Sequence, residues 1–187
     1  MGGRRPPDGG HRETTLGNYT SGVDAKPVLV DVVRGMQSVK LEAVLIGNAA
    51  AALQGAPVTT VDFDFLFRKT TRNLAKLKGL ARILRAVVLR PYYPASDLYR
   101  IVRDDDGLQV DFMTTIHGVR SFEGLRDRAS SIEIDGVSLL VSTLPDIIRS
   151  KRAARRPRDL AVLDILEKTL EERSQQTSSA GRRRPRK

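Results

Sequence analysis

The feature that most constrains this chain is a pair of aspartates two residues apart inside an apolar segment. Residues 61–67 read VDFDFLF. Because side chains alternate between the two faces of a strand, the valine and the phenylalanines share one face, and Asp62 and Asp64 share the other. Two like charges on one side of a partly buried strand cost on the order of several kcal/mol unless a cation or hydrogen-bond donors compensate them. The pair therefore predicts a site for a divalent metal ion.

A third aspartate, Asp111, lies in a second predicted strand. Residues 97–103 and 108–113 are two strand-like runs joined by the tight turn Asp-Asp-Asp-Gly, a pattern typical of an antiparallel hairpin. The leucine, valine and phenylalanine of the second run share one face, so Asp111 points the other way. The turn also contains an Asp-x-Asp pair, Asp104 and Asp106, which we interpret as solvated. Three inward carboxylates on two strands form a specific pattern.

The composition limits which metal such a site could hold. The chain has no cysteine and only two histidines, which excludes a disulfide framework and a thiolate zinc site. Ligands must therefore be oxygen atoms, which favour hard cations. We expect Mg²⁺, or Mn²⁺ in its place.

Charge and composition divide the chain into three predicted parts. Residues 1–26 are rich in glycine and predict a flexible N-terminal arm, residues 27–172 a single folded domain, and residues 173–187 a disordered basic tail. The net charge is +10, and the tail contributes six basic and no acidic side chains. This excess favours an anionic partner such as nucleic acid, although a tail that only keeps the protein soluble is the alternative. No membrane span or signal peptide is predicted, so we expect a cytoplasmic protein.

Hydrophobic periodicity predicts an α/β (α+β mixed) domain with a small mixed sheet and flanking helices. The predicted strands cover residues 41–46, 61–67, 86–89, 97–103, 108–113, 132–134 and 137–140. The predicted helices cover residues 27–37, 48–54, 71–84 and 121–128, followed by two C-terminal helices.

Four features resemble the DNA polymerase β-type nucleotidyltransferase superfamily over about residues 41–168. They are the run Leu-Ile-Gly-Asn at 45–48, the small-residue helix ending at Gly55, the strand with Asp62 and Asp64, and the strand with Asp111. The segment 142–160 is similar to the minimal bacterial branch that includes AbiEii-type toxins and MenT toxins of type IV toxin–antitoxin pairs. The resemblance implies a polymerase β-like nucleotidyltransferase fold, an NTP substrate, Mg²⁺ and the release of pyrophosphate.

The resemblance also implies roles for the aspartates and for the first glycine. Asp62 and Asp64 would bridge two metal ions, and Asp111 would hold the ion on the nucleophile side and orient the hydroxyl proton. Gly47 and Asn48 stand where a strand enters a helix, so backbone N–H groups there could bind a phosphate of the NTP.

A basic cluster near the C-terminus supplies further candidates. In the predicted helix after residue 143, Lys151 continues an apolar stripe and is therefore aimed inward, where it could contact the triphosphate. The alternative is that its ammonium group snorkels to solvent. Arg155, one turn further, is a weaker candidate for the same contact. Asp159 follows Pro-Arg and could cap the next helix or orient Lys151 or Arg155.

Together these features predict an enzyme that transfers a nucleoside monophosphate from an NTP, ATP among the candidates, to a hydroxyl acceptor. We favour the 3′ end of tRNA as the acceptor, with the protein acting as the toxin of a pair and an antitoxin protein as its partner. One alternative is an antitoxin-like enzyme that AMPylates a protein hydroxyl, and a small-molecule acceptor such as an aminoglycoside ranks lower. Another is a catalytically inactive nucleic-acid-binding module, for which Asn48 and Val58 would be signs of lost function.

Overall fold

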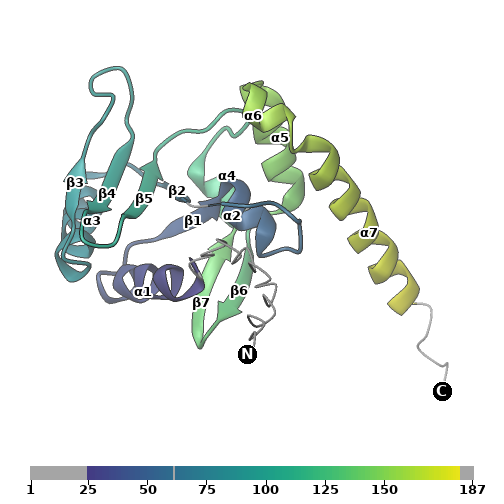
Figure 1. Cartoon of the computed structure of the whole chain (residues 1–187), viewed down its shortest axis with the longest axis horizontal. Helices are drawn as coiled ribbons and strands as arrows, with labels where there is room; N and C mark the ends of the chain where they lie inside the picture. Colours follow the sequence, from purple (N-terminus) through teal and green to yellow (C-terminus); the bar gives the residue numbers. More distant parts are fainter. Residues whose placement is uncertain (1–24, 61, 182–187) are drawn as a thin grey trace, which may run out of the picture.

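The computed structural model describes residues 25–60 and 62–181, which form a mixed α/β fold around one seven-stranded sheet (Figure 1). The strands are β1 (Ala43–Ile46), β2 (Phe63–Phe67), β3 (Val87–Leu89), β4 (Tyr99–Arg103), β5 (Leu108–Met113), β6 (Ser130–Ile134) and β7 (Val137–Val141). They lie in the order β3-β4-β5-β2-β1-β7-β6. β2 is parallel to β5 and β1 is parallel to β7, whereas the remaining neighbours are antiparallel.

Helices lie before, between and after these strands along the chain. They are α1 (Ala25–Ser38), α2 (Gly47–Ala52), α3 (Thr71–Ile83), α4 (Phe122–Arg128), α5 (Leu144–Ala154), α6 (Pro157–Leu160) and α7 (Leu163–Gly181). The predicted α/β class is confirmed, and the strands and the first four helices begin and end within two residues of the predicted bounds. The short helix α6 was not predicted.

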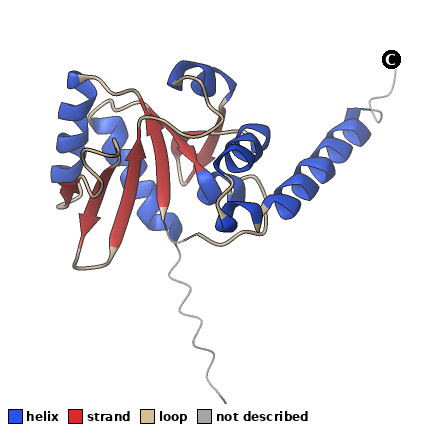
Figure 2. Cartoon of the chain, turned by 90° about the horizontal axis from the view of Figure 1, so that it is seen from above, coloured by secondary structure: helices blue, strands red, loops and turns tan. Residues whose placement is uncertain are grey.

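The two faces of the sheet are covered unequally. The large hydrophobic core contains Leu45, Phe65 and Phe112 together with apolar residues of α1 and α3. On the opposite face, Val44, Ile46 and Leu66 form a smaller cluster with Phe122 and Leu125 of α4. Figure 2 shows helices on both sides of the strands. Because Asp64 and Leu66 share a face, the aspartates lie on the thinly covered side of the sheet.

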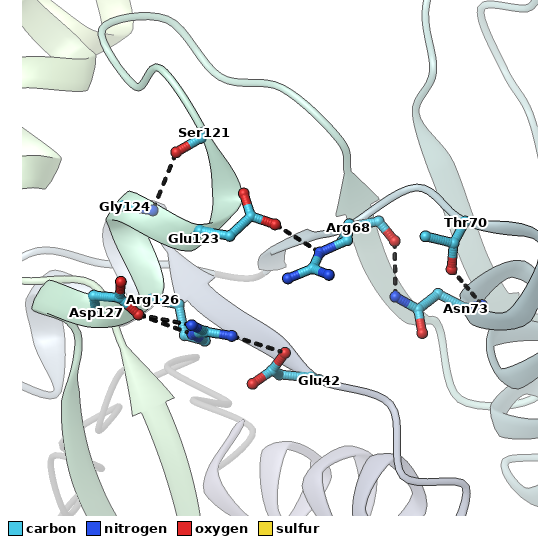
Figure 3. A network of polar contacts seen from close by, with 9 residues as sticks. All are labelled: Glu42, Arg68, Thr70, Asn73, Ser121, Glu123, Gly124, Arg126 and Asp127. Atoms are coloured by element: carbon cyan, nitrogen blue, oxygen red, sulfur yellow. Dashed lines mark hydrogen bonds and ion pairs between the residues drawn. The ribbon is translucent and has the colours of Figure 1, made fainter.

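A polar network holds α4 at the end of β2 that is remote from Asp64 (Figure 3). Arg68, directly after β2, pairs with Glu123 at 2.6 Å, and Arg126 pairs with Glu42 at 3.6 Å. Ser121 caps α4 by accepting a hydrogen bond from the backbone N–H of Gly124 at 3.1 Å. These contacts fix α4 over the half of the face that is remote from the aspartates.

The C-terminal helix corrects one prediction about the ends of the chain. We expected residues 173–187 to be disordered, but α7 continues to Gly181 and runs away from the body of the protein (Figures 1 and 2). Residues 171–177 are all exposed, so this part of the helix adds nothing to the core. The predicted arm falls almost entirely, and the last six residues wholly, outside the described residues.

No helix within the described ranges is both long enough and apolar enough to span a bilayer.

Candidate active site

The sheet pairing places two of the three predicted carboxylates side by side. Asp64 of β2 is the register partner of Asp111 of β5, and Arg100 of β4 lies opposite Asp111. On the other side, Ile46 of β1 lies opposite Asp64. Neighbouring strands are about 4.8 Å apart, so Arg100, Asp111, Asp64 and Ile46 form one row across the sheet, which we call the carboxylate row. Asp62 lies one residue before β2, two residues from Asp64 and half-buried.

The charges of Asp111 and Asp62 also act on Asp64. The pKa of Asp64 is raised from 3.8 to about 6, first by burial and then by the negative charges of Asp111 and Asp62. The positive charges of Arg158 and Lys151 oppose this rise. The structure thus brings Asp62, Asp64, Asp111 and Lys151 together as expected from the sequence. Their catalytic roles stay predictions.

Asp111 has a partner that the sequence reasoning missed. Its two carboxylate oxygens accept hydrogen bonds from Nε and Nη2 of Arg100, both at 2.7 Å. Hydrogen bonding to Asp111 raises the pKa of Arg100 above its ordinary value. This pairing could have been predicted from the hairpin, because counting outward from the turn at 104–107 puts residue 100 opposite residue 111.

The residues present fit a divalent cation in part. Asp62 and Asp64 supply hard oxygen atoms, and the pKa of Asp64 is raised first by burial and then by the negative charges of Asp111 and Asp62, which a bound cation would offset. Both oxygens of Asp111 are already engaged by Arg100, and within residues 25–60 and 62–181 no group of three or more carboxylates or imidazoles is placed to hold an ion together. Asp62 and Asp64 therefore fit as ligands, and Asp111 fits only once Arg100 turns away.

Gly47 belongs to the site because of its backbone and its lack of a side chain. Its φ is +70°, and a Cβ atom added there would lie 2.8 Å from Oδ2 of Asp64. Only glycine adopts this conformation without strain and leaves room for the carboxylate. Gly47 is the first residue of α2, so the phosphate-binding contact predicted for it would lie directly beside Asp64. That contact stays a prediction.

Replacing Gly47 by alanine is expected to damage the site more than the fold. Backbone strain should destabilise the protein by about 1–2 kcal/mol, and the displaced Asp64 carboxylate should lower kcat for nucleotidyl transfer by at least about 10-fold. Chemical denaturation and a transfer assay measure the two effects.

Gly136 is the matched control for this substitution. It has a φ of +75° in the β6–β7 turn, and an added Cβ atom would meet nothing within 4 Å. Gly136→Ala should therefore show the strain without the loss of transfer. Equal losses of transfer in the two variants would contradict the role of Gly47.

Asn48 is held at the same strand-to-helix junction. Its side-chain Nδ2 donates to the carbonyl oxygen of Thr59 at 3.4 Å, whereas its Oδ1 is buried and has no hydrogen-bond partner among the described residues. A buried acceptor without a partner is costly, so this position has a polar group available for a ligand that donates a hydrogen bond. The phosphate contact predicted for Asn48 stays a prediction.

The basic cluster is organised around Asp159. Lys151 is buried along with the apolar stripe of α5, and its Nζ donates to Oδ1 of Asp159 at 3.2 Å. Arg156 donates to the other oxygen of the same carboxylate. Burial raises the pKa of Asp159, but the hydrogen bonds from Arg156 and Lys151 outweigh burial and hold the pKa below its ordinary value. The structure pairs Lys151 with Asp159 and buries its side chain, so Lys151 does not snorkel to solvent. That Asp159 orients Lys151 toward a substrate stays a prediction.

Two details of this cluster differ from the prediction. Asp159 lies inside α6, whose N-cap residue is Arg156, and its carboxylate receives side-chain donors, so the capping role is wrong. Arg155 is exposed and ends α5 in a left-handed conformation with φ of 53°, because the chain turns sharply there. Arg158, which the prediction did not single out, acts on Asp64 instead.

A family model matches residues 25–184 of the chain. The family is described as nucleotidyl transferases of unknown function, DUF2204. No curated protein matches the chain.

Several solved structures are similar to the chain at low sequence identity. A nucleotidyltransferase from Thermotoga maritima matches with a TM-score of 0.52 and 20% identity, covering 78% of this chain and 92% of that one. ANT(2″)-Ia in complex with adenylyl-2″-tobramycin matches with a TM-score of 0.54 and 14% identity, covering 83% and 95%. A nucleotidyltransferase-like protein from Paracoccidioides brasiliensis matches with a TM-score of 0.50 and 16% identity, covering 77% and 76%. These likenesses show the polymerase β-like nucleotidyltransferase fold.

Proposed function

The chain belongs to the family of nucleotidyl transferases of unknown function, and on that premise we propose that it transfers a nucleoside monophosphate from an NTP to the 3′ end of tRNA. One observation carries this proposal furthest: the carboxylate row places Asp64 beside Asp111, and two cations of the C-terminal cluster act on Asp64. Nucleotidyl transfer needs this pairing of negative groups for a cation and positive groups for a triphosphate.

The reaction exchanges one phosphorus–oxygen bond for another. The acceptor hydroxyl oxygen bonds to the α-phosphorus, the bond from that phosphorus to the bridging oxygen breaks, and pyrophosphate leaves with the bond's electron pair. A bound Mg²⁺, held by Asp62 and Asp64, would lower the charge on the phosphate oxygens and the hydroxyl. Asp111 would orient the hydroxyl and accept its proton. Lys151 and Arg158, whose positive charges act on Asp64, would offset the charge of the departing pyrophosphate.

The choice of acceptor and the biological role rest on other support. The chain carries a net charge of +10, which favours a polyanionic acceptor such as tRNA. The toxin role, and with it an antitoxin partner, rests on the resemblance of the sequence to AbiEii-type and MenT toxins. Blocking the 3′ end of tRNA would prevent aminoacylation, which accounts for toxicity.

The test uses the purified full-length protein, Mg²⁺, each of the four α-labelled NTPs and deacylated tRNA. Label is expected in tRNA on a denaturing gel. Periodate-treated tRNA, whose terminal ribose lacks both hydroxyls, is the matched control and should receive no label.

The remaining acceptors are separated in parallel reactions with cell lysate and with tobramycin. Label that enters protein bands but never RNA would replace the tRNA proposal with protein AMPylation. Label on tobramycin alone would point to the small-molecule acceptor that one structural neighbour carries in adenylylated form. An absence of label in every reaction would favour the inactive nucleic-acid-binding module.

A further inference from the structure

The carboxylate row continues outward onto an exposed apolar surface. Leu89 of the edge strand β3 is the register partner of Arg100, and Val87 is the partner of Val102. Leu89 is 46% exposed and Val87 is 57% exposed, whereas Val88 between them packs against the main core. Because side chains alternate, Val87 and Leu89 lie on the same face of the sheet as Asp111 and Asp64.

The loop that follows this edge strand carries two exposed tyrosines. β3 and β4 are joined by a loop that rises above the edge of the sheet (Figure 1) and contains Tyr92 and Tyr93. Tyr92 is 59% exposed, and its charge is among the smaller influences, after Asp111, that raise the pKa of Arg100. Tyr93 is equally open, but its ring is covered by the guanidinium of Arg90 at 3.8 Å.

We propose that the surface formed by Val87, Leu89, Val102 and Tyr92, here called the acceptor shelf, binds the unpaired terminal base of a nucleic-acid acceptor strand. The inference rests on the proposed function and adds the place where the acceptor lies. Leu89 is two strands from Asp111, about 10 Å at ordinary strand spacing. A base on the shelf therefore sets its own sugar hydroxyls over Arg100 and Asp111, where the attacking oxygen has to be.

A nucleic-acid base fits the chemistry of the acceptor shelf better than a flat protein surface does. A base stacked on an exposed aromatic ring gains about 1–3 kcal/mol with little dependence on sequence, and the aliphatic side chains add apolar contact area. Arg100 separates the shelf from Asp111, and its planar guanidinium suits the phosphate that precedes the terminal sugar. Engaging that phosphate would also release the two oxygens of Asp111.

Pairing of β3 with a second copy of this chain is the competing use of the surface. β3 has only three residues, and the basic residues Arg85 and Arg90 flank it on either side. Short, positively charged edges oppose edge-to-edge pairing of identical chains, whereas they attract a phosphate backbone. The observations therefore favour an RNA strand over a dimer.

The test compares Leu89→Ser/Tyr92→Ala with a matched control, Ile83→Ser/Tyr93→Ala. Ile83 is 51% exposed on α3, which packs on the opposite face, and Tyr93 lies in the same loop as Tyr92. The first variant should raise the KM for tRNA about 10- to 30-fold and leave the KM for the NTP unchanged. The control should leave both constants unchanged.

A direct binding measurement tests the acceptor shelf even if no transfer to RNA is found. Fluorescence anisotropy with a labelled single-stranded RNA of about 8 nucleotides should show the same loss in the shelf variant only, at a salt concentration that suppresses binding by the basic tail. Equal RNA binding by wild type and shelf variant, or an increased KM for the NTP alone, would overturn the inference. So would a wild-type dimer that the shelf variant converts to a monomer in sedimentation velocity.

Discussion

Asp64→Asn is expected to abolish nucleotidyl transfer and at the same time to stabilise the metal-free protein at neutral pH. The loss of activity should be at least about 10³-fold, because a neutral amide replaces the central carboxylate of the row. The gain in stability should be on the order of 1–3 kcal/mol at pH 7.5, because the pKa of Asp64 in the folded protein is about 6 instead of 3.8. A substitution that removes function and adds stability is typical of a site selected for chemistry.

The pH dependence of this stabilisation follows from the sign of the shift. A carboxyl group whose pKa is raised by folding binds protons more tightly in the folded state than in the unfolded one. Well below pH 3.8 both states are protonated, and Asp64 costs nothing. The cost develops between about pH 4 and 6 and is complete above that range. The free energies of unfolding of the wild type and Asp64→Asn, measured by urea titration with EDTA present, should therefore converge as the pH falls well below 3.8 and separate by about pH 7.

Asp104→Asn is the matched control for this prediction. Asp104 begins the other Asp-x-Asp pair, in the exposed turn of the β4–β5 hairpin. It should leave both transfer and stability at pH 7.5 within ordinary error. If Asp64→Asn transfers nucleotides at the rate of the wild type, the assignment of the active site is wrong.

The sequence predicted the features that depend on alternation and periodicity. The period of two in the Asp62 strand and in the hairpin set which face each aspartate occupies, and the stripe of α5 set the inward direction of Lys151. The position of Arg100 was also readable, since a tight turn fixes the register of its hairpin. Arg100 was not among the predicted site residues because a guanidinium cannot ligate a metal ion and instead competes with one for Asp111.

The features that the sequence could not predict depend on tertiary contacts or on a surface helix. The capping role expected for Asp159 fails because the left-handed residue Arg155 turns the chain, so that Asp159 folds back on Lys151. The end of α7 is helical although it has no apolar stripe, and all of residues 171–177 are exposed. Periodic burial cannot reveal a helix segment that buries nothing, and residues such as glutamate and glutamine favour one without it.

The second large effect is expected at the buried pair of Lys151 and Asp159. Asp159→Ala should destabilise the protein by about 3–5 kcal/mol, because it leaves the ammonium group of Lys151 buried without its carboxylate. Lys151→Met should cost much less, since Asp159 keeps the hydrogen bond from Arg156 and methionine fills a similar volume. Urea denaturation of both variants and of the double variant Lys151→Met/Asp159→Ala gives the coupling energy, and the double variant should be more stable than Asp159→Ala alone.

Lys151→Met should be the more stable of the two single variants but should lose transfer activity, so the two measurements separate the structural role of the pair from the catalytic role of Lys151. Lys151→Met should lower kcat by about 10²- to 10³-fold although it folds well, because a cation that acts on Asp64 and can offset the charge of pyrophosphate is gone. Arg152→Met, the next residue of α5, is the control: its side chain is exposed and pairs with Glu167, so it should change stability by less than about 0.5 kcal/mol and leave kcat near the wild-type value. If Lys151→Met retains full activity, Lys151 serves only to neutralise Asp159, and the triphosphate must be bound by other cations, with Arg158 as the first to test.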